Sequence, residues 1–290
     1  MEESRLELRT ETTIAFYRLL FADQEARLAS ENFRSLQEMA RAINRRVAAG
    51  EGARFEAVKA EVEALKGKKE VERTRAAVEI AKTGLNALTA GGLGESFEVV
   101  GDFEVPLPSL DRSGLISRIE QHPALKRQAQ ILSRLQQLVV HERQARIPDV
   151  AVQGAYSQDV ERQGYGLGLA VPVPIWSQRQ GEIAAALGAQ RRAEADLLRI
   201  RTELTKSLIQ SYQDTRSAAN QLAVFQQGLL KQAEEAWRMA QFSFRQGAST
   251  LLELLDAQRV YRQTLQDYAQ ARFNLSVARA RLERAAGGVL

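Results

Sequence analysis

The C-terminal third of the chain carries a seven-residue hydrophobic repeat. Its first stripe consists of Leu254, Tyr261, Tyr268, Leu275 and Leu282, and its second of Ala257, Thr264, Ala271, Ala278 and Ala285. Two stripes offset by three residues predict a left-handed coiled-coil seam, and small residues on one stripe let a neighbouring backbone approach closely. A single amphipathic helix lying on an ordinary core is the alternative interpretation.

The run before this helix offers a partner seam. Its members are Leu222, Phe225, Leu229, Ala236, Ala240 and Phe244. Gly247 separates the two runs, and glycine commonly ends a helix. We therefore expect an antiparallel hairpin with one continuous helix from about Arg179 to Arg245, roughly 100 Å long, and a returning helix from about Leu251 to Ala286.

Proline and glycine organise the remaining sequence. All six prolines lie between residues 106 and 174, so both flanks lack the strongest helix breaker. The first flank also resembles the second at an offset of about 197 residues. The matching pairs are Gly50 with Gly247, Glu56 with Glu253, Ala60 with Ala257 and Leu85 with Leu282, and Tyr17 matches Tyr212 after a slip of two residues. This pattern predicts an internal repeat, although two alanine-rich helices can also match by chance.

Two segments of alternating character lie between the flanks. They follow a helix-favouring run from Pro123 to Arg146 and begin at Val150 and Gly164. Their larger apolar residues, which alternate with small or polar ones, are Val150, Val152, Leu167, Leu169, Val171 and Val173. The alternation predicts a β-hairpin. A transmembrane barrel hairpin with these residues facing lipid and a soluble hairpin packed on helices fit the pattern equally well.

Composition narrows the chemistry. The chain has 290 residues and no cysteine, which excludes disulfides and thiol nucleophiles, and its two histidines, His122 and His141, lie far apart in the sequence. We expect no metal site, no cofactor and no enzymatic activity, because no nucleophile, base and oxyanion donors can be assembled. The net charge of +4 is spread over interspersed charges and gives little support to nucleic-acid binding.

Four stretches together resemble the TolC family of outer-membrane efflux proteins. In chain order they are RVAAGEGARFEAVKAEV (Arg46–Val62), the His-Pro helix start and following strand (Gln121–Gln158), GLGLAVPVPIWSQRQGEIAAA (Gly166–Ala186) and FRQGASTLLELLDAQRVY (Phe244–Tyr261). The resemblance covers essentially the whole chain. It implies a mainly α fold of long antiparallel coiled-coil helical hairpins of the α-barrel type, with one β-hairpin contributing to an outer-membrane β-barrel.

The resemblance also implies a domain organisation. Residues 1–105 match the helical hairpin of an incomplete first repeat, and residues 106–148 match the linker and helix of the second repeat. Residues 149–175 match its β-barrel hairpin, and residues 176–290 its long helical hairpin. Relatives form trimers whose barrels have twelve strands, which is four strands from each copy. This chain matches only one pair of strands, so three copies would supply six. We therefore expect an N-terminally truncated chain without a signal peptide.

The function that the resemblance implies is a passive trimeric duct, the outer-membrane component of a tripartite pump. Its implied partners are two further copies, outer-membrane lipid, a periplasmic adaptor (membrane fusion) protein and an inner-membrane pump of the RND type. The stretch VPVPIWSQRQGEIAAA is more similar to the heavy-metal cation branch than to other branches. A soluble periplasmic coiled-coil scaffold without a pore is the alternative function.

Site residues carry over by position. Glu56, Glu253 and Asp256 match acidic positions of the pore gate, and Gly50, Gly247, Arg245 and Ser249 match the helical tips that contact the adaptor. Threefold symmetry would gather the carboxylates of Glu253 and Asp256 around one axis and favour cations. Acidic residues near a helix start also interact favourably with the helix dipole, so an ordinary helix-start role is the alternative.

Overall fold

The computed structural model describes residues 2–94, 96–103, 111–147, 149–158, 162–171 and 178–288. The chain divides into two units, one made of residues 1–116 with 207–290 and the other of residues 117–206. Helix α5 (Gln180–Val224) begins in the second unit and ends in the first. Val173 lies outside the described residues, so its expected place on a lipid-facing strand stays a prediction.

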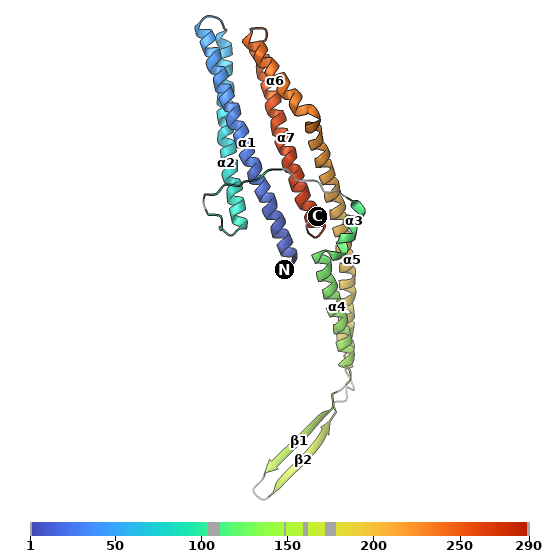
Figure 1. The fold of residues 1–290 in the computed structure, drawn as a ribbon. Coiled ribbons are helices and arrows are strands. Elements are labelled where there is room, and N and C mark those ends of the chain that lie inside the picture. Colours follow the sequence, from blue (N-terminus) through green and yellow to red (C-terminus); the bar gives the residue numbers. More distant parts are fainter. Residues whose placement is uncertain are drawn as a thin grey trace. The chain divides into compact units, whose positions relative to one another are not determined.

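The first unit contains two helical hairpins (Figure 1). One is formed by α1 (Glu2–Ala48) and α2 (Arg54–Leu88), and the other by α6 (Leu230–Arg245) and α7 (Leu251–Ala285). Adding 197 to the residue numbers of Ala48, Arg54 and Leu88 gives Arg245, Leu251 and Ala285, so the two hairpins share the end of the first helix and both bounds of the second. The internal repeat expected from the sequence is therefore present in the structure.

The two hairpins contact each other through α1 and α7. Phe21 of α1 stacks on Phe273 of α7 with 5.1 Å between ring centroids, and the Gln258 side-chain amide donates to Asn32 Oδ1 at 3.0 Å. Since α2 packs on α1 and α6 packs on α7, the four helices are neighbours in the order α2, α1, α7, α6. In this order α1 and α7 each have a helix on two sides, whereas α2 and α6 lie at the two ends.

Helix α7 buries two sides because it packs between α1 and α6. Both predicted stripes supply buried residues, including Leu254, Leu275, Leu282, Thr264, Ala271, Ala278 and Ala285. A further set lies beside them, made of Leu251, Gln258, Ala269, Ser276, Val277 and Ala280. The predicted coiled-coil seam is confirmed, and a helix that buries only one face is excluded.

Buried hydroxyl groups in the seams satisfy themselves locally. Thr74, Thr215 and Ser276 are at most 1% exposed, and each donates its hydroxyl to the carbonyl four residues earlier in its own helix, at 2.8–3.1 Å. An unpaired buried hydroxyl would cost about 1–3 kcal/mol. These small polar residues therefore occupy tight helix contacts without that penalty.

The helix expected to run from Arg179 to Arg245 is interrupted. A π-turn at Phe225–Leu229 separates α5 from α6, and within it Gly228 has φ 130° and ψ −8°. One extra residue in a turn rotates all later positions by about 100° around the axis. The seam predicted after this point is only partly correct: Ala240 and Phe244 are half-buried, but Leu229 and Ala236 are exposed, and Ala233 and Trp237 are buried instead.

An extended segment, residues 96–103, which we call the strap, lies against α1, α2 and α7. Its Phe97 and Val99 pack on a cluster formed by α1 and α2. Phe103 stacks on Tyr17 of α1 at 5.9 Å and lies 5.2 Å from the guanidinium of Arg272 on α7. The strap thus contacts both hairpins.

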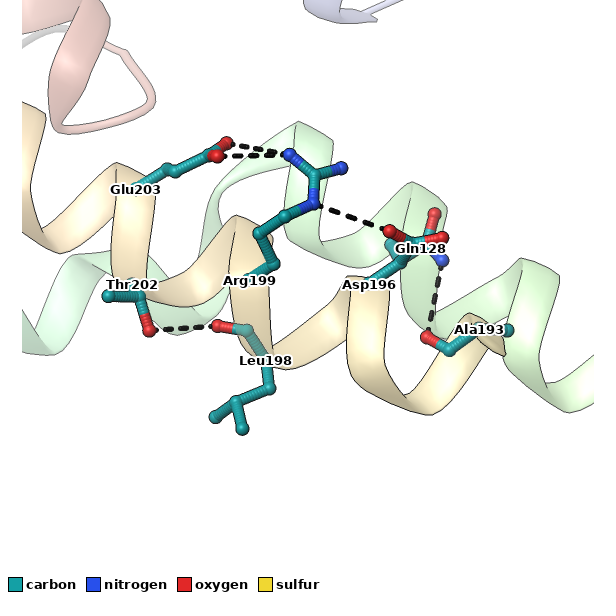
Figure 2. A network of polar contacts seen from close by, with 7 residues as sticks. All are labelled: Gln128, Ala193, Asp196, Leu198, Arg199, Thr202 and Glu203. Carbon is teal, nitrogen blue, oxygen red and sulfur yellow. Dashed lines mark hydrogen bonds and ion pairs between the residues drawn. The ribbon is translucent and has the colours of Figure 1, made fainter. Parts of the chain in front are cut away.

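The second unit pairs α4 (Pro123–Gln144) with the first part of α5. It also contains the end of α3 (Arg112–Arg118) and the short helix Ile119–Gln121. Figure 2 shows the buried Gln128 of α4 donating to the Ala193 carbonyl of α5 at 3.3 Å, while Arg199 joins Asp196 and Glu203 along the exposed face of α5. One amide therefore supplies a hydrogen bond between the helices, and the charged side chains stay in solvent.

The predicted β-hairpin is present in the second unit. Strand β1 (Ala151–Gln158) pairs antiparallel with β2 (Gln163–Ala170). The register places Val152 opposite Leu169 and Tyr156 opposite Tyr165. Val150 and Val171, predicted as strand residues, lie just outside the two strands, where the ladder of backbone hydrogen bonds has ended.

The seam of α7 yields a stability prediction. Ala271 is only 5% exposed, so Ala271→Leu should overpack the interface and lower the free energy of unfolding by about 1–3 kcal/mol. Urea denaturation followed by circular dichroism measures this change. Arg281→Leu, at an exposed position of the same helix, is the control and should change stability by less than about 0.5 kcal/mol. Equal stability of both variants and the parent would contradict the burial of Ala271.

Candidate functional site

Both hairpins turn through the same backbone structure. In each turn the glycine N–H donates to the carbonyl three residues earlier, and the following N–H donates to the carbonyl five residues earlier. The pairs are Gly50 with Val47, Glu51 with Arg46, Gly247 with Phe244 and Ala248 with Ser243, at 2.9–3.0 Å. Gly50 and Gly247 have φ of 76° and 73°, a left-handed conformation that glycine adopts without strain. The two predicted turn glycines are thus equivalent.

The helix starts after the two turns differ. In the second hairpin, the Glu253 N–H donates to Thr250 Oγ1 at 3.3 Å, and the Thr250 N–H donates to Glu253 Oε2 at 2.8 Å. This reciprocal capping box satisfies two backbone donors at the start of α7. In the first hairpin, Ala53 occupies the equivalent position and offers no side-chain cap. Glu253 therefore has a helix-start role, and its side chain is also exposed.

The acidic residues expected at the gate are only partly brought together. Glu253 and Asp256 lie one turn apart at the exposed start of α7. Asp256 accepts a hydrogen bond from Arg259 at 2.6 Å, which offsets part of its charge. Glu56 is half-buried in the first turn of α2, on the other hairpin. Of the three acidic residues predicted for the gate, only Glu253 and Asp256 lie on the same helix, one turn apart.

The remaining predicted tip residues have local contacts. Arg245 is exposed and donates to the Gln241 carbonyl at 3.3 Å. The hydroxyl of Ser249 is buried and has no hydrogen-bond partner in the described part of the chain. Sequence reasoning missed the contact that joins the tips, in which the Arg46 guanidinium lies 5.6 Å from the ring centroid of Phe244. No local pattern pairs these two residues, because they belong to different repeats.

A charged groove lies between α2 and α7, with Asn32 and Leu36 of α1 contributing to its lining. Its volume is about 460 Å³. Five basic and three acidic side chains line it: Lys59, Lys66, Lys69, Arg259, Arg262, Glu63, Glu70 and Asp256. Asp256 thus faces this groove as well as solvent near the tip. The sequence did not reveal the groove, since its walls come from different repeats.

A second polar cavity of about 440 Å³ is lined by residues of α1, α2 and α7. Arg73 donates two hydrogen bonds to Glu70, at 3.0 and 2.8 Å, and holds the pKa of that carboxyl below its usual value. Burial raises the pKa of Glu25, against the opposing effect of the Arg73 charge. Glu25 therefore binds a proton at higher pH than Glu70 does.

Arg272 of α7 is the centre of a stack of side chains that the sequence did not predict. Its guanidinium forms an ion pair with Asp102 of the strap and lies 5.2 Å from the Phe103 ring and 5.6 Å from the Tyr268 ring. Tyr268 in turn lies 5.7 Å from Phe225 at the start of the π-turn. Cation–π contacts contribute about 0.5–2 kcal/mol each, depending on desolvation. The stack connects the strap, α7 and the end of α5.

The β-hairpin has two chemically different faces. Residues opposite each other in the register share a face, so Val152, Leu167 and Leu169 lie together with Tyr156 and Tyr165, whose ring centroids are 5.1 Å apart. All five are exposed, and Leu167 is 90% exposed. The other face carries only small or polar side chains: Ala151, Gln153, Ala155, Ser157, Gly164, Gly166, Gly168 and Ala170. A row of large apolar residues in solvent is unfavourable and indicates a missing apolar partner.

The two histidines serve α4. His122 is buried and its Nδ1 accepts the Ala124 N–H at 3.2 Å, which caps the helix that Pro123 begins. His141 lies in the last turn of the same helix. The described residues contain no group of three or more histidine, aspartate or glutamate side chains placed to hold a metal ion. None of the helices in that part of the chain is both long enough and apolar enough to cross a membrane.

Solved membrane proteins share the fold of this chain. CusC gives a TM-score of 0.86 at 17% identity, over 99% of this chain and 70% of that one. A membrane protein of Pseudomonas aeruginosa gives 0.84 at 17% identity, over 98% and 68%. The outer-membrane protein VceC of Vibrio cholerae gives 0.82 at 17% identity, over 99% and 71%. These matches confirm the predicted fold class.

Sequence comparisons agree with the fold. The cobalt-zinc-cadmium resistance protein CzcC of Cupriavidus metallidurans is 29% identical over 258 residues. The matched region covers 88% of this chain and 62% of CzcC, so the chain spans less than two thirds of this relative. The family model "Outer membrane efflux protein" matches residues 116–288, which is more than half of the chain. The chain therefore belongs to the outer membrane efflux protein family.

Proposed function

We propose that this chain forms the outer-membrane channel of a tripartite efflux system. It acts as a passive trimeric duct, with its strands in the outer membrane and its helices in the periplasm. A periplasmic adaptor protein and an inner-membrane pump of the RND type complete the system and supply the energy. Family membership and fold support this proposal. The observation that carries it is the contact between α1 and α7, because its repeat-related equivalent requires a second copy.

The internal repeat specifies how copies join. In one chain, α1 of the first repeat contacts α7 of the second. The equivalent pair is α6 of the second repeat and α2 of the first. These two helices lie at opposite ends of the order α2, α1, α7, α6, so the contact becomes available only between copies. A heterologous contact that repeats around an axis closes a ring.

Exposed apolar rows lie on the two helices that this contact would join. On α2, Phe55, Val58, Val62 and Leu65 are 44–73% exposed and follow one another at steps of three, four and three residues. On α6, Met239 and Phe242 are 72% and 62% exposed and three residues apart. Apolar rows at coiled-coil spacing favour packing against another helix. They support ring closure between copies.

The β-hairpin supports a membrane location. Its large apolar face suits lipid, and its face of small and polar side chains suits a lumen. Val150 and Val171 extend the apolar row beyond the paired strands and are 63% and 47% exposed. A soluble scaffold has no need for this face.

Glu253 and Asp256 are proposed to line the narrow end of the duct. The capping role of Glu253 is compatible with a pore role, because its carboxylate stays exposed while it accepts the Thr250 N–H. Three copies would bring six carboxylates towards one axis, with Glu56 contributing from the other hairpin. Such a constriction prefers cations.

The cargo is proposed to be heavy-metal cations. The identity with the cobalt-zinc-cadmium resistance protein supports this assignment. An acidic constriction would pass such cations without binding them in a closed ligand set. Selection among metals would then belong to the pump.

Ring closure can be tested at Leu65, which is 66% exposed on α2. Leu65→Lys would bury an unpaired charge between copies and should convert most of the trimer to monomer. Light scattering after size exclusion in detergent measures the oligomeric state. Leu198→Lys on α5 is the matched control, since Leu198 is 64% exposed, and it should remain trimeric. A trimer that persists in Leu65→Lys would contradict the proposed α2–α6 contact.

The gate can be tested with the double variant Glu253→Gln and Asp256→Asn. Loss of up to six charges near one axis should weaken cation preference and reduce block by trivalent cations, while trimer stability stays nearly unchanged. Reversal potentials across a salt gradient and block titrations in planar bilayers, using the whole protein, measure both effects.

The matched control for the gate is Asp196→Asn with Glu203→Gln on α5. These two acids are exposed and paired with Arg199, much as Asp256 is paired with Arg259. The control should keep the parent reversal potential. If the gate variant also keeps it, Glu253 and Asp256 return to an ordinary helix-start role.

A further inference from the structure

We propose that the charged groove between α2 and α7 binds a multivalent oxyanion, of which inorganic phosphate is the simplest example. The groove has a volume of about 460 Å³, and its walls come from helices of different repeats. Five basic and three acidic side chains line it. The partners of these charges determine what the groove can bind.

The acidic side chains of the groove already have basic partners. Each acid lies within 2.8 Å of a basic side chain three residues away on its own helix. The pairs are Glu63 with Lys66, Glu70 with Arg73 and Asp256 with Arg259. All three acids of the groove are therefore engaged before its remaining basic residues are considered.

Three basic side chains of the groove have no acidic partner. Lys59 and Lys69 of α2 and Arg262 of α7 form no ion pair with any residue that the structure describes. The charges of Lys69 and Arg262 both lower the pKa of Glu70, so the two helices direct positive charge at the same place. Lys59 and Arg262 are also half-buried, so solvent screens them less than it screens fully exposed charges. Uncompensated positive charge on both walls favours an anion that contacts both.

A buried amide in the groove also lacks a partner. Gln258 is 6% exposed, and its Nε2 donates to Asn32 Oδ1 at 3.0 Å, while its Oε1 accepts no hydrogen bond from the residues described. If both amides turned over, Asn32 would donate to Gln258 Oε1, and the Gln258 N–H groups would then lack an acceptor. One polar group of Gln258 is thus unsatisfied in either orientation. An oxyanion in the groove satisfies it in the second orientation, because the oxygens of the ion accept hydrogen bonds.

The donors around the groove match the chemistry of an oxyanion. The ammonium groups of Lys59 and Lys69 and the guanidinium of Arg262 carry only hydrogen-bond donors, and phosphate or carboxylate oxygens accept from them. Such charge-assisted hydrogen bonds are stronger than neutral ones. An ion with several charged oxygens can interact with donors on both walls at once, which a chloride ion cannot do as well. The groove therefore favours multivalent oxyanions over chloride.

The site lies beside the proposed gate. Asp256 also lines the groove, so the groove opens on the side of α7 that is proposed to face the duct. This placement rests on the proposed function, whereas the binding itself does not. A bound oxyanion would add negative charge next to Glu253 and Asp256 and would strengthen the preference for cations.

Equilibrium dialysis of radiolabelled inorganic phosphate against the whole chain in detergent measures binding directly, with chloride held constant and in excess. We expect saturable binding of phosphate to a single class of site. Absence of saturable binding in the parent would overturn the proposal. The readout requires neither a trimer nor a pore. A failure here would therefore leave the proposed function standing, and a failure of the channel measurements would leave this site standing.

The double variant Lys69→Gln and Arg262→Gln removes one uncompensated charge from each wall. It should weaken phosphate binding at least about tenfold, because charge-assisted hydrogen bonds from both helices are lost. The matched control, Lys68→Gln with Arg281→Gln, removes the same number of charges from the same two helices at exposed positions outside the groove. It should bind phosphate within about twofold of the parent, since distant exposed charges are screened. Equal affinities of the two double variants would reduce the effect to net charge and overturn the site.

A competition experiment separates a free oxyanion from a lipid head group. Glycerophosphoglycerol carries the singly charged phosphodiester of an anionic phospholipid, whereas free phosphate can carry two charges. It should displace labelled phosphate much less effectively than unlabelled phosphate does. Equal displacement would assign the groove to a phosphodiester and overturn the assignment to a multivalent ion.

Discussion

The packing of α7 between α1 and α6 is the constraint on which the first unit depends. A helix with neighbours on two sides has to bury two faces, and close approach on both requires small side chains. Ala269, Ala271, Ser276, Ala278 and Ala280 meet this need, each at most 8% exposed. Because α7 joins the two hairpins, larger side chains on its buried faces would disturb the packing of both. The same helix also carries the acids proposed for the gate.

Polar groups give this packing its register. Most ion pairs along the helix surfaces of the described residues are exposed pairs three or four residues apart, and such pairs contribute little to stability. The contact of Gln258 with Asn32 is different, because it crosses between hairpins and Gln258 is 6% exposed. Arg272 makes another long-range contact, reaching the strap with a side chain that is 18% exposed. Sliding α7 along α1 would break the contact of Gln258 with Asn32 and move Arg272 away from Asp102 and Phe103 of the strap.

The two hairpins share a backbone but not their chemistry. Both turns contain a glycine with positive φ, and the helices on either side of the turn end and begin at equivalent positions. Only the second hairpin has a capping box, and only its outgoing helix contains the π-turn. The second hairpin thus combines a well-defined start of α7 with an interrupted partner helix.

Much of this protein follows from the sequence by itself. The glycines at the turns, the heptad stripes of α7, the repeat and the alternating strands are local patterns, and a local pattern determines a backbone conformation and the face that an element buries. The tertiary structure decided which faces meet. The pairing of α1 with α7, the contact of Arg46 with Phe244 and the stack around Arg272 join residues from distant parts of the chain, and no spacing rule connects them. The π-turn at Gly228 also interrupts the predicted seam, so that Ala233 and Trp237 are buried in place of Leu229 and Ala236, while Ala240 and Phe244 stay half-buried as predicted.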